Sequence, residues 1–333
     1  MEYVTLGSTG LQVSRVGFGG IPIQRIDTIA AVSLLKAVHE HRINYIDTAR
    51  GYTVSEELIG QAIQGHRDEF ILATKSMSRN KAAMQADINT SLRNLRTGYI
   101  DLYQVHNPTL EQLEQVCGPD GALEALREAK SAGKIGHIGL TAHSPDVFAR
   151  GLDLDWVETV MFPYSIVETH GTELMEKARA KGIGFICMKP LAGGAIEDAA
   201  LALRFALSNP NVSLVIPGMY SPEEVAQNTS VEAAPLTAAD EKKIEEIRRT
   251  LGTNFCRRCG YCAPCTAGIN LPNTFTFHGY LSRYGLETWA RDRYAAMPAK
   301  AGDCVGCGAC EERCPYQLPV REMLKKVAAD FGA

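Results

Sequence analysis

Eight short apolar runs, separated by segments of helical periodicity, recur between residues 16 and 216. They cover residues 16–20, 45–49, 70–74, 100–105, 137–141, 159–162, 184–188 and 212–216. Near-continuous apolar runs are typical of parallel strands that are buried on both faces. Between the runs, apolar residues recur at helical spacing, as in the series Met84, Ile88, Leu92 and Leu95. Eight strand–helix units in series predict a closed (β/α)8 barrel, an α/β fold, over residues 1–235.

Eight of the ten cysteines lie near the C-terminus in two tight runs. The runs are Cys256, Cys259, Cys262 and Cys265, and then Cys304, Cys307, Cys310 and Cys314. The second run is followed by Pro315 and has the C-x2-C-x2-C-x3-C-P spacing of bacterial ferredoxins. In the first run the fourth cysteine comes one residue early and no proline follows it. The runs predict a small, mainly helical, ferredoxin-like iron–sulfur domain over residues 256–333, joined to the barrel by a helical linker over 236–255.

The cysteine spacing also predicts how the thiolates are shared. In two-cluster ferredoxins the fourth cysteine of each run serves the other cluster. On this pattern, two [4Fe–4S] clusters are expected: one on Cys256, Cys259, Cys262 and Cys314, and one on Cys304, Cys307, Cys310 and Cys265. Structural zinc is the alternative, because C-x2-C pairs also suit tetrahedral zinc. Disulfides are disfavoured, because the first residues do not resemble a secretory signal and a reducing, cytoplasmic location is therefore expected.

The overall composition excludes several other functions. Hydrophobic residues make up 45% of the chain, which is ordinary for a globular protein with a sizeable core. No apolar run approaches the roughly 20 residues that are needed to span a bilayer. The net charge of −4 offers no basic face for nucleic acid. We therefore expect a small-molecule substrate rather than a membrane or nucleic-acid partner.

Polar, titratable residues follow three consecutive apolar runs. Asp47 and Tyr52 come at or after the second run, Lys75 ends the third, and His106 ends the fourth. Any one of them alone has a simple structural explanation, such as a loop cap or a surface ion pair. In a (β/α)8 barrel, however, the carboxyl ends of the strands form one rim, and catalytic groups lie there. The four residues together therefore predict an active site at this rim.

Residues 44–60 resemble the D-T-A-x-x-Y-x-x-x-E-x-x-[IL]-G signature of the aldo/keto reductase family, and residues 6–14 resemble its opening. The resemblance covers roughly residues 1–232, and with the cysteine runs the chain resembles a subgroup that has a C-terminal ferredoxin-like extension. It implies that the catalytic tetrad of the family falls on Asp47, Tyr52, Lys75 and His106. Tyr52 would protonate the carbonyl oxygen as hydride arrives, and Lys75 would favour its phenolate. Asp47 would hold Lys75, and His106 would orient and polarise the carbonyl.

The resemblance also implies a nicotinamide cofactor, although several expected contacts differ. The candidate contacts are Thr141, His143, Met161, Met188, Lys189, Pro190, Leu191, Gly218 and Asn228. Thr141-Ala142 replaces the usual Ser-Asn, Met161 a glutamine and Met188 a tyrosine. Glu223 and Glu224 lie where a 2′-phosphate is expected, and like charges argue against a strong NADP preference. Lys189 offers a compensating cation, so NAD(P)H is expected and the choice between NAD and NADP is open.

The expected function is therefore an oxidoreductase that interconverts an aldehyde or ketone with an alcohol. Its clusters would relay electrons to or from a ferredoxin- or flavodoxin-like carrier. A hydride carries two electrons whereas a cluster accepts one, and this mismatch leaves two alternatives. In one, the clusters reduce the substrate one electron at a time while the tetrad supplies protons. In the other, the cysteine-rich region is a structural, redox-sensing or partner-docking module.

Overall fold

The structure is a computed structural model that describes residues 1–231, 234–251, 256, 262–282, 285–314 and 317–332. The chain forms two compact units. The first comprises residues 1–165, 169–190 and 198–236, and the second comprises residues 166–168, 191–197 and 237–333. Each unit is described by itself. The domain boundaries expected at 235/236 and 255/256 stay predictions.

The first unit is built on eight parallel strands in sequence order. They are β3 (Phe18–Gly19), β4 (Tyr45–Asp47), β5 (Ile71–Ser76), β6 (Ile100–His106), β7 (Ile135–Thr141), β8 (Thr159–Pro163), β9 (Gly184–Met188) and β10 (Leu214–Ile216). Each strand lies at one of the eight apolar runs, which are buried as expected for strands covered on both faces. The predicted α/β fold with eight parallel strands is confirmed.

The two ends of this sheet meet, so the strands enclose a barrel. Val16 bridges to Val215 and Gly19 bridges to Gly218, both in parallel register. The amide of Gly19 donates to the carbonyl of Pro217 at 2.9 Å. A Cβ atom at Gly19 would lie 2.7 Å from that carbonyl oxygen, so this seam requires glycine.

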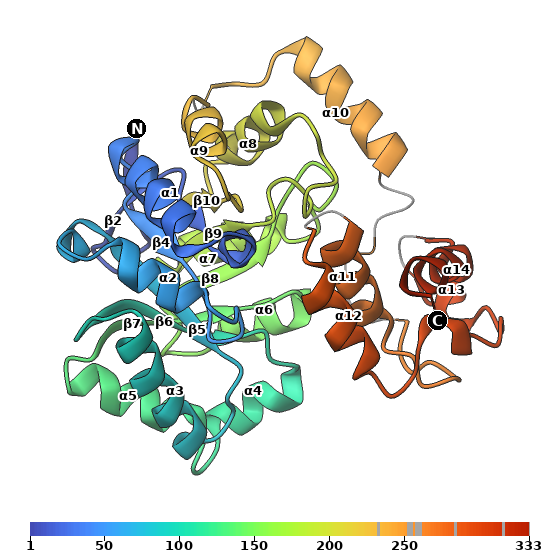
Figure 1. Ribbon diagram of the computed structural model, residues 1–333, viewed down its shortest axis with the longest axis horizontal. Helices are drawn as coiled ribbons and strands as arrows, with labels where there is room; N and C mark the ends of the chain where they lie inside the picture. Colours follow the sequence, from blue (N-terminus) through green and yellow to red (C-terminus); the bar gives the residue numbers. More distant parts are fainter. Residues whose placement is uncertain (232–233, 252–255, 257–261, 283–284, 315–316, 333) are drawn as a thin grey trace. The chain divides into compact units, whose positions relative to one another are not determined.

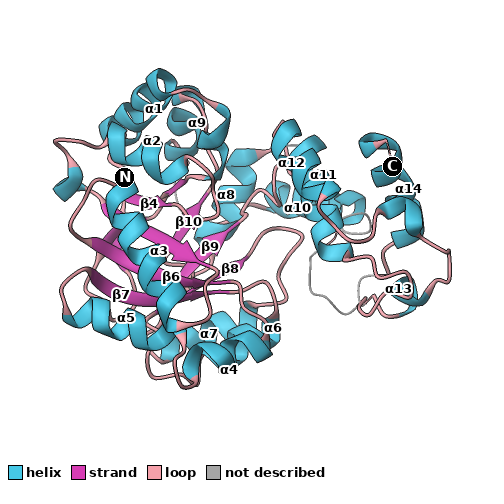
Figure 2. Ribbon diagram, turned by 60° about the horizontal axis from the view of Figure 1, so that its bottom comes forward, coloured by secondary structure: helices cyan, strands magenta, loops and turns pink. Residues whose placement is uncertain are grey.

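Nine α-helices follow the strands in the described part of the first unit and surround them (Figures 1 and 2). They are α1 (Thr28–Glu40), α2 (Ser55–Ala62), α3 (Lys81–Asn94), α4 (Leu110–Cys117), α5 (Ala122–Ser131), α6 (Pro145–Gly151), α7 (Thr172–Ala180), α8 (Ala199–Ser208) and α9 (Pro222–Thr229). Several begin at a side-chain cap: Asp27, Asn80 and Asp198 each accept a backbone N–H from the first turn. The short 3-10 turns η1 (Ile21–Arg25) and η2 (Arg67–Glu69) complete this unit.

A hairpin covers the N-terminal end of the barrel. Its strands, β1 (Tyr3–Thr5) and β2 (Gln12–Ser14), are antiparallel. Leu6 and Val13 are fully buried in one cluster with inward-facing strand residues such as Tyr45 and Leu102. The amide of Ser8 donates to the carbonyl of Gly182, just before β9. Because this end is closed, the carboxyl ends of the strands are the end at which a site can form.

The second unit is helical in all of its described elements. They are α10 (Ala238–Leu251), α11 (Leu271–Ser282), α12 (Glu287–Ala295), η3 (Ala301–Asp303), α13 (Ala309–Glu312) and α14 (Val320–Phe331). Leu271, Phe275, Leu318 and Leu324 are buried in its core. None of the helices in the described part of the chain is long and apolar enough to cross a membrane. The predicted mainly helical C-terminal region is confirmed.

Candidate functional site

A buried ion pair lies inside the barrel, near the carboxyl ends of β4 and β5. The Lys75 ammonium donates to Asp47 Oδ2 at 2.5 Å and to the carbonyl oxygen of Thr48 at 2.7 Å. Lys75 is 2% exposed and Asp47 is 3% exposed. Gln104, which is paired with Lys75 in the β5–β6 register, approaches Asp47 Oδ1 from Nε2 at 3.4 Å. Three neighbouring strands therefore contribute side chains to one buried polar cluster.

The two charges of this pair depend on one another. Burial lowers the pKa of the Lys75 ammonium, and the charge and hydrogen bond of Asp47 oppose that shift. Burial raises the pKa of the Asp47 carboxyl, and Lys75 opposes that shift. Removing either partner would leave a desolvated group without its counter-charge.

Tyr52 and His106 lie beside this pair. Lys75 Nζ is 5.1 Å from the centroid of the Tyr52 ring. The rings of Tyr52 and His106 meet edge to face, with centroids 6.2 Å apart. All four residues of the predicted tetrad are therefore brought together at one end of the barrel.

His106 has the electrostatic environment of a neutral imidazole. Burial lowers its pKa well below the ordinary value, and the positive charges of Lys75, Arg79 and Lys189 add to that shift. Its Nδ1 atom is buried, and no described residue provides it with a hydrogen-bond partner. The ring can therefore offer one N–H and one lone pair without adding charge.

The loop that carries Tyr52 is held by Glu56, at the start of α2. Glu56 accepts hydrogen bonds from Arg50 at 2.6 Å, Thr74 at 2.8 Å and Ser91 at 2.7 Å. Its side chain is 1% exposed, so this carboxylate is buried but well satisfied. Glu56 falls on the glutamate of the signature over residues 44–60, but the sequence did not reveal its partners.

Replacing Glu56 with glutamine should lower the free energy of unfolding by about 1–3 kcal/mol. The amide would lose the ion pair with Arg50 and would direct N–H groups at hydroxyl donors. Urea unfolding of the cluster-loaded protein measures the change. Glu57→Gln is the matched control, because Glu57 is its exposed neighbour on the same helix. Equal unfolding midpoints for the two variants would contradict this role of Glu56.

Three of the residues predicted to contact a nicotinamide are linked at the same end of the barrel. Thr141 Oγ accepts the amide of Asn107 at 2.9 Å, and Asn107 Oδ1 accepts the amide of His143 at 3.1 Å. Lys189 Nζ lies 2.8 Å from His143 Nε2. Asn107 and Lys189 both adopt left-handed backbone conformations, which are uncommon for residues other than glycine. Asn107 and Arg79, whose guanidinium donates to the carbonyl of His106 at 2.8 Å, were not predicted from the sequence.

The other six predicted cofactor contacts do not belong to this hydrogen-bonded group. Met161 and Met188 belong to the buried cluster inside the barrel. Asn228 is buried on α9, Gly218 lies at the barrel seam, and Pro190 follows Lys189. Leu191 belongs to the second compact unit. The assignment of all nine residues to cofactor binding stays a prediction.

Four of the predicted cluster ligands line a single cavity in the second unit. They are Cys265, Cys304, Cys307 and Cys310. The hydroxyl of Thr266 lies 3.5 Å from Cys307 Sγ, and this hydrogen bond lowers the pKa of that thiol. Four cysteine thiols are the donor set that a [4Fe–4S] cluster requires, so the residues that line this cavity fit that group in kind and number.

The ligand set of the other predicted cluster is described only in part. Cys256, Cys262 and Cys314 pack against the apolar core of the second unit. Cys259, together with Pro315, lies outside the described residues.

Two family models match this chain. The model of the aldo/keto reductase family matches residues 15–200 and 196–249. The model of a 4Fe-4S dicluster domain matches residues 255–319. The first match covers the barrel and extends into α10, and the second covers the cysteine-rich region, in agreement with the resemblance in the sequence.

Comparison with individual proteins also finds oxidoreductases, including an aldo-keto reductase of known structure. The uncharacterized oxidoreductase YqkF of Bacillus subtilis is 30% identical over 258 residues, which cover 73% of this chain and 81% of YqkF. L-galactose dehydrogenase of Arabidopsis thaliana is 26% identical over 303 residues, which cover 75% of this chain and 94% of that protein. The holo form of aldo-keto reductase AKR11C1 from Bacillus halodurans superposes with a TM-score of 0.66 at 29% identity, covering 74% of this chain and 96% of that one.

Proposed function

Because this chain belongs to the aldo/keto reductase family of oxidoreductases and carries a 4Fe-4S dicluster region, we propose that its barrel interconverts a small aldehyde or ketone with the corresponding alcohol. The observation that carries the proposal is the buried Lys75–Asp47 pair beside the ring of Tyr52. Such a pair is costly to bury, and it places a cation next to a phenol at the open end of the barrel. The name of the relative L-galactose dehydrogenase supports a small-molecule substrate of this class.

In this proposal Tyr52 moves the proton. Hydride addition to a carbonyl carbon leaves negative charge on the oxygen, which a positioned acid must neutralise. The Tyr52 hydroxyl donates its proton to that oxygen, and the nearby Lys75 ammonium stabilises the phenolate that is left. Asp47 keeps Lys75 charged and in place. In the oxidative direction the same groups act in reverse.

His106 orients the carbonyl. As a neutral imidazole it donates one N–H to the substrate oxygen without competing with Tyr52 as an acid. Its backbone carbonyl is bonded by Arg79, and its strand is paired with β7 up to Thr141. These contacts support a fixed ring position at the end of β6.

A nicotinamide, when bound, supplies or accepts the hydride. Thr141, His143 and Lys189 are the residues we expect to hold it, because they form one polar group at the end of the barrel where Tyr52 lies. Glu223 and Glu224 lie in the first turn of α9, and they would disfavour a 2′-phosphate bound there. Binding titrations with NADH and NADPH, followed by turnover of an aldehyde panel, test this part of the proposal.

The clusters provide one-electron chemistry when bound, and we propose two of them with crossed ligation. The cavity lined by Cys265 and the three cysteines of the second run supports one crossed set. A ferredoxin- or flavodoxin-like carrier would exchange electrons with these clusters. Cysteines that bind iron–sulfur clusters must stay reduced, so we expect the protein to work in a reducing compartment such as the cytoplasm.

Anaerobically purified protein should contain about eight iron atoms and eight sulfides per chain. Cys265→Ala should lower the iron content by about four, because Cys265 completes the set of the second run. Iron and sulfide analysis measures both values. Cys117→Ala is the control, since Cys117 lies on α4 of the barrel. A Cys265→Ala protein that keeps its full iron content would overturn the crossed assignment.

A second candidate function follows from Met161 and Met188, which stand where a glutamine and a tyrosine are expected to contact the nicotinamide. Met161 is 1% exposed in the barrel core, and a thioether cannot replace the amide hydrogen bonds of a glutamine. If the nicotinamide is not held, the tetrad would supply protons while electrons arrive singly. Product formation that requires dithionite or a reduced ferredoxin, and does not respond to NADH or NADPH, would establish this alternative.

A further inference from the structure

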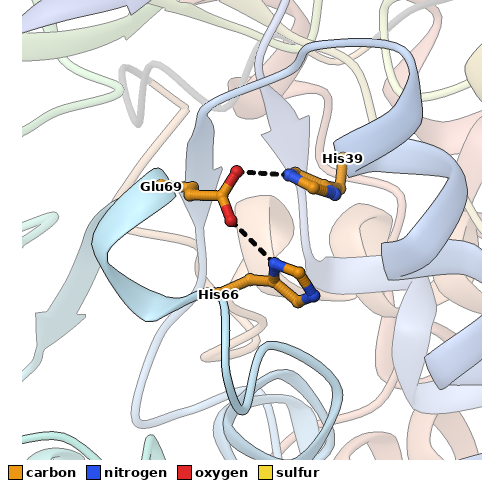
Figure 3. A group of neighbouring side chains, drawn as sticks. All are labelled: His39, His66 and Glu69. Carbon is orange, nitrogen blue, oxygen red and sulfur yellow. Dashed lines mark hydrogen bonds and ion pairs between the residues drawn. The ribbon is translucent and has the colours of Figure 1, made fainter.

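Two histidines and a glutamate converge on the surface of the barrel unit (Figure 3). His39 Nε2 lies 2.6 Å from Glu69 Oε2, and His66 Nδ1 lies 2.7 Å from Glu69 Oε1. The two imidazole rings lie close together, with centroids 4.7 Å apart and planes tilted by 39°. The hydrogen bonds from His66 and His39 lower the pKa of the Glu69 carboxyl.

The elements that carry these side chains are firmly held. His39 lies in the last turn of α1, and its ring packs 5.8 Å from that of Phe70. His66 immediately precedes η2 and Glu69 is its last residue, and the amide of Glu69 donates to the carbonyl of His66. Within η2, Arg67 bonds the carboxylate of Asp101 on β6 at 2.7 Å. The three donors are therefore presented by backbone that is fixed to the barrel.

We propose that His39, His66 and Glu69 form a binding site for a divalent transition-metal ion of the zinc type. Two imidazole nitrogens and one carboxylate oxygen are a common zinc donor set, with water completing the coordination. The three ligand atoms already lie within 4.8 Å of one another. A tetrahedral site with Zn–N bonds of about 2.0–2.1 Å needs donors about 3.3 Å apart. His66 and Glu69 are exposed and His39 is partly exposed, so small side-chain rotations would bring the donors to that spacing.

The site differs in place and in role from the candidate active site. The turn that follows α1 leads into β4, and η2 leads directly into β5. The three proposed ligands therefore lie near the amino ends of these two strands. Tyr52, Lys75 and His106 lie at the opposite, carboxyl ends. An ion bound by His39, His66 and Glu69 would cross-link the end of α1 to the turn before β5. Features at this end of a (β/α)8 barrel serve stability rather than catalysis.

Calorimetric titration of ZnCl2 into the anaerobic, cluster-loaded protein tests the proposal. We expect one saturable site in the barrel unit that weakens at least tenfold in His39→Ala and in His66→Ala. At the same zinc concentration, the unfolding temperature of the wild type should rise by several degrees and that of both variants by clearly less. Cluster absorbance and iron content are followed in parallel, so that exchange of iron for zinc at the cysteines is detected.

His41→Ala is the matched control. His41 is an exposed histidine two residues from His39, and its Nδ1 faces Thr229 Oγ at 2.9 Å. This variant should bind zinc as the wild type does. Equal zinc affinity in His41→Ala, His39→Ala and His66→Ala, or no zinc binding with the clusters intact, would overturn the proposal. If no zinc binds, His39, His66 and Glu69 form a hydrogen-bonded cluster and not a metal site.

Discussion

Tyr52→Phe should reduce the rate of carbonyl reduction by about 10²–10⁴-fold, because the substrate oxygen loses its proton donor. The substitution removes one hydroxyl and keeps the ring that lies 5.1 Å from Lys75 Nζ and edge to face with His106. The dissociation constant of the nicotinamide should therefore stay close to that of the wild type. Steady-state kinetics with an aldehyde substrate, combined with a fluorescence titration of the cofactor, measure both quantities.

Tyr99→Phe provides a control for the loss of a tyrosine hydroxyl. Tyr99 immediately precedes β6, at the amino end of that strand, and it is partly exposed. Its variant should turn over like the wild type. Near-wild-type activity of Tyr52→Phe would show that another group supplies the proton.

Lys75→Met should destabilise the protein by about 3–5 kcal/mol as well as abolish turnover. The substitution leaves the Asp47 carboxylate buried without its ammonium partner and removes the hydrogen bond to the carbonyl of Thr48. Urea unfolding measures the loss. Lys36→Met is the matched control, because Lys36 is exposed and its Nζ lies 3.7 Å from Glu40 Oε1. This variant should lower the free energy of unfolding by less than about 1 kcal/mol.

A double variant separates the structural effect from the catalytic effect. When Asp47→Asn is added to Lys75→Met, the uncompensated charge is gone and most of the lost stability should return. Activity should stay absent, because no cation stabilises the phenolate of Tyr52. A double variant as unstable as Lys75→Met would contradict the ion-pair account of this cluster.

The strands were predictable because each is buried on both faces. The run 184–188 coincides with β9, and all of its residues are buried between the neighbouring strands β8 and β10. The run 16–20 contains only the two-residue strand β3, because its pairing with β10 consists of isolated bridges at Val16 and Gly19. An apolar run is a local property of the sequence, whereas the extent of pairing depends on the partner strand.

The candidate site was predictable where side chains follow strand ends. Asp47 and His106 end β4 and β6, and Lys75 is the penultimate residue of β5, so barrel geometry alone brings them to one rim. Glu56 and Gln104 were not predicted as part of it. Their partners depend on the packing of α3 and on the β5–β6 register, and no local pattern reports these.

The division of the chain into units was only partly accessible from the sequence. The segments 166–168 and 191–197 follow β8 and β9, yet they belong to the second compact unit. A loop gives no periodic signal that reveals what it packs against.

The central claim is that hydride reaches the substrate from a nicotinamide at the Tyr52 site. Its most direct test is anaerobic turnover of an aldehyde with NADH or NADPH as the only reductant, with loss of nicotinamide absorbance and formation of alcohol followed together. The account predicts one nicotinamide oxidised per alcohol formed in the wild type, and both rates lowered by about 10²–10⁴-fold in Tyr52→Phe. Alcohol that forms only when dithionite or a reduced ferredoxin is supplied would contradict it.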